Sequence, residues 1–243
     1  MKKLLQVSAV LIAAVLLFAG CKNNADDDSL PGKWKNDIQY YNGTVDMTTA
    51  DAALGVPETA IGTVTWDGQG GAVYSFESPF DPYAGTKDAL QQNHFFNYAY
   101  GFMGSQYSDL TGFDAVASCT SSRAPYGFYF NIHSESNRWT DYYELLFEGT
   151  AFRIGQKVNG EWTTLHAWDN ATAINASPKN NNISVYKDGD VIKIKVNGTI
   201  ISTIENPELT EGFIGFACAF SYDDIQNHTA VTSTYKINQV QYK

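Results

Sequence analysis

The stretch that decides the fold runs from Tyr142 to Phe220 and reads YYELLFEG-TAFRIGQKV-NG-EWTTLHAW, then NNISVYKDGD-VIKIKVNG-TIISTIEN, then EGFIGFACAF. Three dipeptides punctuate it: Asn159-Gly160, Asp188-Gly189 and Asn197-Gly198. Asn-Gly and Asp-Gly supply the positive φ angles of a two-residue type I′ turn, whose twist matches paired strands. Between the turns apolar and polar residues alternate, as in VIKIKV at 191–196. A period of two buries one face of a strand, so the stretch predicts an antiparallel meander.

The amino-acid composition fits an all-β domain and narrows the function. Hydrophobic residues make up 44% of the 243 residues, and the 15 Tyr, 14 Phe and 5 Trp are side chains that pack well on pleated sheets. The net charge of -10 argues against nucleic acid as a partner, because phosphates require Lys and Arg. The chain shows no internal repeat and no second composition regime. We therefore predict one β-sandwich domain over residues 33–243.

Short segments with strand-like patterns lie before and after the meander. They cover residues 33–41, 60–66, 72–76, 113–121, 126–134 and 233–242. Residues 77–110 are less regular, and we interpret them as an insertion that either covers a face of the sandwich as a lid or extends one edge. Within them, TKDALQQN at 86–93 predicts a short helix, and the aromatic residues 94–104 predict a buried strand or a packed loop.

Residues 1–20 have the three parts of a bacterial export signal. Lys2 and Lys3 are followed by an apolar run and then by small residues before Cys21. The run FAGC at 18–21 resembles the lipobox of bacterial lipoproteins, with Phe18 where Leu is usual. The resemblance implies diacylglyceryl transfer to the Cys21 thiol, cleavage before it and acylation of the new amino terminus. Several acyl chains hold a protein stably on a membrane. The alternative is an ordinary secretory signal with a chance cysteine.

Residues 21–32 form the predicted link between this lipid and the domain. They are polar and contain three consecutive aspartates, Asp26 to Asp28, which is typical of a flexible tether. Lys22 follows the cysteine where an Asp would signal inner-membrane retention in two-membrane bacteria. The leader therefore predicts a lipid-anchored, extracytoplasmic place in the cell envelope, with the outer membrane or the cell surface favoured.

The features from Phe113 to Lys243 follow one another in a specific order. They are YGFYF at 126–130, YYELL at 142–146, FRI at 152–154, NGEW at 159–162, NISV at 182–185, VNG at 196–198 and GFIGF at 212–216. This order resembles the concanavalin-A-like jelly roll in its LamG and 3-keto-disaccharide hydrolase-type branch. The resemblance implies an all-β sandwich of two stacked, curved antiparallel sheets with a concave face. Such folds host lectins, glycanases, adhesion modules and passive spacers, so the fold does not give the function. PGKW at 31–34 resembles the opening of lipocalin-like barrels, a distant alternative for the first third of the chain.

Aromatic residues in and beside the meander form the best candidate for a ligand site. Carbohydrate binding requires exposed aromatic faces that stack on sugar rings, beside amides or carboxylates that bond to hydroxyl groups. The candidate ligand-binding residues are Trp139, Tyr142, Trp162, Trp168 and Asn170. Trp162 and Trp168 share strand parity with Thr164 and His166, which places all four on one face. The alternative is that these rings pack in the core.

The chain lacks the motifs of the common catalytic sites. Laminarinase-like glycanases of this fold carry Glu-x-Asp-x-x-Glu on one strand, and the nearest match here is Asp141 with Glu144. Their odd separation puts them on opposite faces of a strand, so they cannot flank one glycosidic bond. Glu144 and Glu148 share a face, which we predict to be outer and solvated. The scattered histidines make no metal-binding pair, and no Gly-x-Ser-x-Gly elbow is present.

Two cysteines remain beyond the leader. Cys119 and Cys218 both share parity with apolar neighbours, so both are predicted to face inward. In an oxidising compartment they either form a disulfide or remain as two buried thiols. Sequence supplies no geometry to choose between these alternatives.

Acidic loops suggest calcium as the one candidate cofactor. LamG-type domains often hold Ca²⁺, and the candidate ligands are Asp109 with Asp114 and Asp223 with Asp224. Calcium requires six to eight converging oxygens, so a second loop would have to contribute.

The sequence as a whole predicts a membrane-anchored extracytoplasmic lipoprotein whose jelly roll binds a glycan, a matrix glycoprotein or another extracellular ligand. One alternative is a glycoside hydrolase or lyase of the 3-keto-disaccharide type, which carboxylates meeting on the concave face would favour. Another is a structural or protein-interaction envelope lipoprotein without a small ligand, which an exposed apolar patch without a cleft would favour.

Overall fold

The structure is a computed structural model that describes residues 30–35, 61–66, 72–77, 95–102, 109–135, 138–221 and 231–243. It describes the backbone alone for residues 61–66, 72–77, 95–102 and 218–221 and for Lys35, Ser134 and Arg138. The chain divides into two units, Met1–Leu30 and Pro31–Lys243. The lipobox-like segment with Cys21 and most of the tether lie outside the described residues. In the part that is described, no helix has the length and apolar character needed to cross a membrane.

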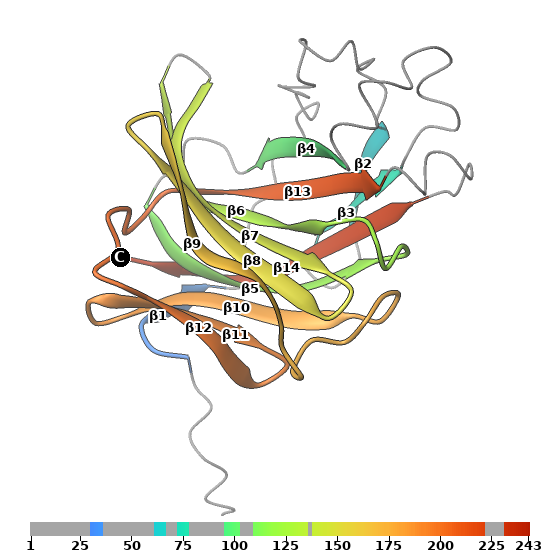
Figure 1. The fold of residues 1–243 in the computed structure, drawn as a ribbon. Coiled ribbons are helices and arrows are strands. Elements are labelled where there is room, and N and C mark those ends of the chain that lie inside the picture. Colours follow the sequence, from blue (N-terminus) through green and yellow to red (C-terminus); the bar gives the residue numbers. More distant parts are fainter. Residues whose placement is uncertain are drawn as a thin grey trace, which may run out of the picture. The chain divides into compact units, whose positions relative to one another are not determined.

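The second unit consists of two antiparallel sheets (Figure 1). The large sheet has eight strands in the order β12-β11-β10-β5-β14-β3-β2, with β1 also paired to β14. Its strands are β1 (Lys33–Lys35), β2 (Ile61–Trp66), β3 (Ala72–Glu77), β5 (Leu110–Cys119), β10 (Asn181–Asp188), β11 (Val191–Val196), β12 (Thr199–Glu205) and β14 (Thr232–Tyr242). The small sheet has six strands in the order β4-β13-β6-β7-β8-β9. They are β4 (Phe95–Phe102), β6 (Tyr126–Glu135), β7 (Arg138–Glu148), β8 (Ala151–Val158), β9 (Glu161–Asn170) and β13 (Phe213–Ser221).

The chain passes repeatedly from one sheet to the other. It crosses between β3 and β4, β4 and β5, β5 and β6, β9 and β10, β12 and β13, and β13 and β14. Two stacked antiparallel sheets exchanging strands in this way form a jelly-roll sandwich. The predicted all-β jelly roll is therefore confirmed.

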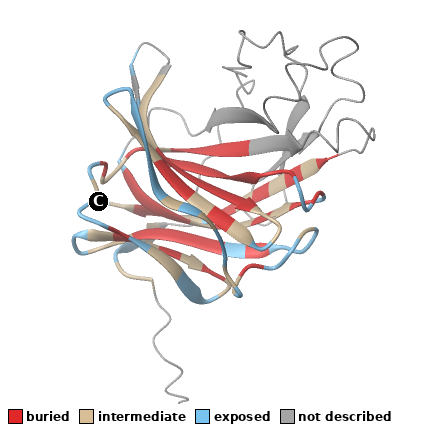
Figure 2. Cartoon of the chain, viewed as in Figure 1, coloured by how far each residue is buried: buried red, intermediate tan, exposed pale blue. Residues whose placement is uncertain are grey.

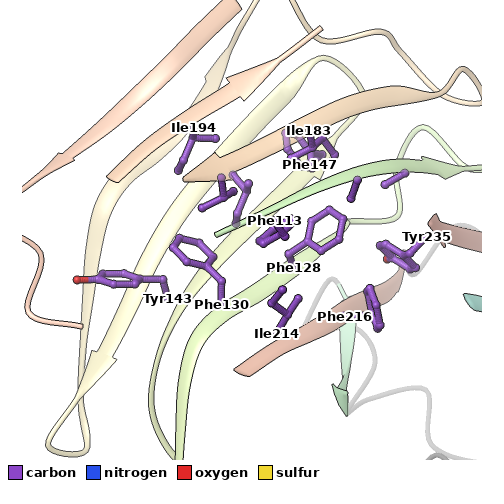
Figure 3. Close-up of a cluster of buried hydrophobic side chains, with 14 of the residues drawn as sticks. Phe113, Phe128, Phe130, Tyr143, Phe147, Ile183, Ile194, Ile214, Phe216 and Tyr235 are labelled. Carbon is purple, nitrogen blue, oxygen red and sulfur yellow. The ribbon is translucent and has the colours of Figure 1, made fainter. Parts of the chain in front are cut away.

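The core lies between the two sheets and is rich in aromatic rings. Phe113 of the large sheet meets Phe128 of the small sheet with ring centroids 4.7 Å apart, and both side chains are fully buried (Figure 3). Along β11 the residues alternate between half-buried and buried, as the VIKIKV pattern predicts. Each inward side chain removes apolar surface from water, and this burial is the main term that stabilises the sandwich.

Two of the three predicted type I′ turns are confirmed, and the third is wrong in register. Asn159-Gly160 and Asn197-Gly198 have positive φ at both residues, 53° and 81° in the first, 48° and 87° in the second. In the third hairpin Asp188 pairs with Val191, so the turn consists of Gly189-Asp190. Only Gly189 has positive φ there, at 62°. Glycine first is the pattern of a type II′ turn, which needs one left-handed residue instead of two.

The irregular region before β5 contributes to the small sheet. Residues 95–102 form β4, which pairs with β13 from Phe95 opposite Ser221 to Phe102 opposite Ile214. Of the two roles predicted for residues 77–110, the described part extends an edge. The helix predicted at 86–93 lies outside the described residues. The first predicted strand is described only as the short β1.

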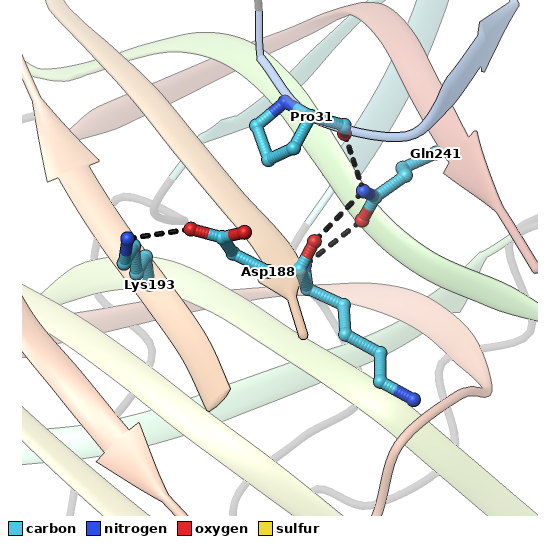
Figure 4. A network of polar contacts seen from close by, with 5 residues as sticks. Pro31, Asp188, Lys193 and Gln241 are labelled. Carbon is cyan, nitrogen blue, oxygen red and sulfur yellow. Dashed lines mark hydrogen bonds and ion pairs between the residues drawn. The ribbon is translucent and has the colours of Figure 1, made fainter. Parts of the chain in front are cut away.

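Gln241 joins the start of the domain to its centre (Figure 4). Its Nε2 donates to the carbonyl oxygens of Pro31 at 2.7 Å and Lys187 at 3.0 Å. Its Oε1 accepts from the Lys187 amide at 2.9 Å and from the Thr111 hydroxyl at 3.1 Å. Trp34 Nε1 also donates to the Pro31 carbonyl, at 2.9 Å. Because Gln241 is 3% exposed, these bonds are shielded from water, and we call the group the Gln241 clasp.

Burial of Tyr126 in the core predicts that the protein loses stability in alkaline solution. Burial, and to a smaller extent Cys119, raises the pKa of Tyr126 from 10.0 to about 12, although the hydrogen bond from Asn181 opposes this. The folded state therefore holds the phenol proton more tightly than the unfolded chain does. The free energy of unfolding is unaffected below pH 10 and falls between pH 10 and 12, by on the order of 2 kcal/mol.

Urea unfolding at several pH values measures this effect. Tyr126→Phe keeps the ring and removes the titrating group, so its stability is expected to fall less steeply over the same interval. Parallel pH profiles for the two proteins would show that Tyr126 does not carry the effect.

Candidate aromatic binding face

The candidate site lies on the face of the small sheet that points away from the core. Along β7, the side chains of Tyr143, Leu145 and Phe147 are fully buried in the core. Because side chains alternate along a strand, Tyr142 and Glu144 point to the opposite face.

Cross-strand pairing places the site residues in two rows. Tyr142 of β7 lies opposite Lys157 of β8, which lies opposite Trp162 of β9. In the next row Tyr129 of β6 lies opposite Glu144, which lies opposite Gly155. Residues directly opposite one another in neighbouring strands are close enough for their side chains to interact.

Five rings gather on this outer side, and we call Tyr129, Trp139, Tyr142, Trp162 and Trp168 the aromatic face. The Tyr129 centroid lies 5.3 Å from that of Trp139 and 5.1 Å from that of Tyr142, both edge to face. Tyr142 lies 6.1 Å from Trp139 and 6.3 Å from Trp162. Edge-to-face packing at these separations is favourable beyond simple burial. Tyr129, Trp139 and Tyr142 therefore support one another.

One ion pair lies among these rings. Arg153 donates from Nη2 to Glu144 Oε1 at 2.5 Å, and the Tyr129 hydroxyl donates to Glu144 Oε2 at 3.0 Å. The guanidinium carbon lies 6.0 Å from the Trp162 ring centroid and 5.4 Å from that of Trp168, within cation–π range. Burial, and then the charge of Glu144, raise the pKa of Tyr129 well above its ordinary value, so this phenol remains a donor.

The position of Glu144 corrects one prediction. It is on the outer face, as its parity indicates, but it is 3% exposed and not solvated. The Arg153 charge and the Tyr129 hydroxyl offset the cost of removing this carboxylate from water. The Asp141 carboxylate accepts from the Asn159 amide at 2.6 Å, so it is already bound to the backbone of the turn at residues 159–160.

Exposure of the aromatic face increases from β6 toward the sheet edge at β9. Tyr129 is 5% exposed and Trp162 is 45% exposed, and the other three rings are half-buried. Figure 2 shows that β9 is largely exposed. The Trp162 ring crosses Gly155, where any Cβ would overlap it. The surface that a ligand can reach therefore extends over β7, β8 and β9.

The structure brings four of the five predicted ligand residues together. Trp139, Tyr142, Trp162 and Trp168 all belong to the aromatic face, and Asn170 lies at the end of β9, where its Oδ1 accepts from the Thr150 hydroxyl at 2.8 Å. The sequence interpretation placed Glu144 on the outer face but missed its polar neighbours there, Tyr129, Arg153 and Lys157. Their strand parity could have found them, because RIGQK at 153–157 places Arg153, Gly155 and Lys157 on one side.

The cysteine and calcium predictions remain predictions. Cys119 is buried in the large sheet, and Cys218 belongs to β13 of the small sheet, but its side chain lies outside the described residues. Asp114 accepts from the Ser184 hydroxyl at 2.8 Å. Asp109 is exposed, and Asp223 and Asp224 lie outside the described part. Within the part described, no three His, Cys, Asp or Glu side chains converge on a point where a metal ion could bind.

Several proteins of known structure are similar to this chain in fold. No family model and no curated protein matches the sequence. The carbohydrate binding module CBM66 from Bacillus subtilis is 12% identical with a TM-score of 0.46, over 74% of this chain and 92% of that one. A Bacillus licheniformis β-glucanase is 14% identical with a TM-score of 0.48, over 89% of this chain and 94% of that one. Sheep galectin-11 in complex with glycerol is 10% identical with a TM-score of 0.35, over 47% of this chain and 87% of that one. At this level of similarity, none of them says what this chain binds or catalyses.

Proposed function

We propose that the domain binds a glycan on the aromatic face. The observation that carries the proposal is the gathering of Trp139, Tyr142, Trp162 and Trp168 around the Glu144–Arg153 ion pair on the outer side of one sheet. Large rings on the outside of a sheet leave apolar surface in water, whereas sugar rings present C–H faces that stack on such surfaces.

The polar groups of the site also suit a sugar, because they can bind its hydroxyl groups. Both carboxylate oxygens of Glu144 are already hydrogen-bonded, so this residue holds Arg153 in place. The Arg153 side chain remains 25% exposed, and its guanidinium carries several donors that can reach the hydroxyl groups of a ring stacked on Trp162. In the proposal Trp162 is the platform, with Trp168 and Tyr142 beside it, and Arg153 orients the ligand.

We also propose that the domain is held in the cell envelope by lipid on Cys21. The support is the leader, with its basic start, its apolar run and FAGC before a polar tether. Mass spectrometry of the membrane-extracted protein tests it, since acylation adds a defined mass to the peptide that begins at Cys21. A Cys21→Ala protein that stays in the membrane fraction would contradict it.

Trp162→Ala tests the glycan site. On a glycan array, residues 22–243 are expected to retain a defined set of glycans. Trp162→Ala is expected to weaken binding of the best of them about tenfold, equivalent to about 1.4 kcal/mol, because it removes the apolar ring on which the sugar stacks. Ile200→Ala is the matched control, because Ile200 is 48% exposed on the large sheet and Trp162 is 45% exposed on the small one.

Two outcomes would change the assignment. Retention of no glycan, or equal binding by wild type and Trp162→Ala, would contradict the proposal and favour the structural alternative. Appearance of shortened oligosaccharides by mass spectrometry after incubation would show turnover and favour the hydrolase or lyase alternative.

A further inference from the structure

The reachable part of the aromatic face carries a positive charge without a partner. The Lys157 ammonium lies 6.0 Å from the centroid of the Tyr142 ring. Across the residues that the structure describes, no carboxylate forms an ion pair with it. The Glu144 carboxylate is buried and already bound to Arg153 and Tyr129, so it does not offset this charge at the surface.

Strand pairing directs two of the nearby acidic side chains to the other side of the sheet. Asp141, Glu161 and Asp169 each adjoin a residue of the aromatic face, namely Tyr142, Trp162 and Trp168. Glu161 pairs with Val158 and Asp169 pairs with Phe152, and both partners pack in the core, so these two carboxylates point away from the aromatic face. The Asp141 carboxylate accepts from the Asn159 amide at the turn. Glu148 shares the parity of Glu144 but pairs with Ala151, so it lies about 20 Å along the strands from Lys157. The face is therefore locally cationic in a chain whose net charge is -10.

The two cations also have a spacing that suits one ligand. Arg153 and Lys157 point to the same side of β8 and lie about 13 Å apart along it. Trp162 is opposite Lys157, and its ring reaches back across Gly155 toward Arg153. A sugar stacked on Trp162 thus has a cation at either end, and an oligosaccharide of a few rings spans both.

We propose, on the basis of the glycan-binding function above, that the ligand is an acidic glycan. A carboxylate or sulfate group on its rings binds the ammonium of Lys157, and the rings stack on Trp162 beside Arg153. A neutral glycan would leave Lys157 without a partner, whereas an anion gains a charge-assisted hydrogen bond there.

Matched ligands and matched variants test this inference by calorimetry on residues 22–243. The probes are oligouronates of several linkages, each with its carboxyl-reduced neutral form, and sulfated oligosaccharides, each with its desulfated form. At least one acidic probe is expected to bind about tenfold more tightly than its neutral form at low salt. That advantage is expected to shrink as salt is added, because salt screens exposed charges. The two sets of probes distinguish a carboxylate from a sulfate.

Lys157→Gln is expected to reduce binding of the preferred acidic probe about five- to tenfold and to change binding of its neutral form less than twofold. Lys187→Gln removes the same charge from the large sheet and is expected to change neither. Equal binding of acidic and neutral forms, or equal effects of the two variants, would overturn the inference and leave glycan binding in place. If no glycan of either kind binds, the glycan-binding function itself fails.

Discussion

Arg153→Met is expected to lower the free energy of unfolding by about 3 kcal/mol, because it leaves a carboxylate buried without its cation. Glu144 is 3% exposed and depends on Arg153 and Tyr129 for all of its side-chain bonds. Methionine keeps much of the apolar stem of arginine. The loss of stability therefore measures the effect of removing the positive charge and not that of creating a cavity. Urea unfolding at neutral pH with a circular dichroism signal measures it.

The double variant Arg153→Met with Glu144→Gln is the matched control. Glutamine is neutral and still offers Tyr129 an acceptor, so the double variant is expected to regain more than half of the lost stability. A single variant as stable as wild type, or a double variant no better than the single one, would contradict the view that the ion pair carries this cost.

Gly127→Ala is expected to have the other large effect, a loss of stability of about 3 kcal/mol or more. Gly127 lies in β6, opposite Leu146 of β7 and Ala217 of β13, so strands flank it on both sides. A Cβ there would overlap the carbonyl oxygen of Leu145, which is backbone in the middle of the sheet and cannot move alone. The β6–β7 pairing would have to open, and we expect poor recovery of folded protein.

Gly155→Ala is the variant to compare with Gly127→Ala, because there the added Cβ would overlap a side chain instead of backbone. Its Cβ would overlap the Trp162 ring, which is the end of a side chain that is 45% exposed and can rotate outward. The fold is expected to survive within about 1 kcal/mol. Glycan affinity is expected to fall, because the platform is displaced. Equal loss of stability in the two variants, by urea unfolding, would show that Trp162 is held more firmly than we infer.

The period-two pattern placed Tyr142 and Glu144 on one face correctly, because alternation along a regular strand is a local property. It does not account for Trp139, which shares that face with Tyr142, or for His166, which stacks on Phe152 in the core, because the pairings of β7 and β9 shift register there. Trp162 and Trp168 share a face in the sequence and in the structure. Burial of Glu144 was not predictable, because it depends on Tyr129 and Arg153, which the neighbouring strands β6 and β8 bring beside it. The same holds for β4, whose partner β13 is distant in sequence.

Turn register was the other limit of sequence reasoning. At Asp188-Gly189-Asp190 two neighbouring dipeptides both suit a tight turn, and local sequence does not choose between them. The choice depends on which residues of β10 and β11 face the core, since a slip of one residue would reverse their sides.

The Gln241 clasp also determines how the domain carries mechanical load. It fastens Pro31 to β14 and β10 of the large sheet, whereas the aromatic face belongs to the small sheet. A force applied through the N-terminal segment would act first on the clasp and on the short strand β1, which pairs with β14 of the large sheet. With a ligand bound at Trp162 as proposed above, drag on it would enter through the other sheet. The two forces would then meet across the packing between the sheets, where Phe113 contacts Phe128.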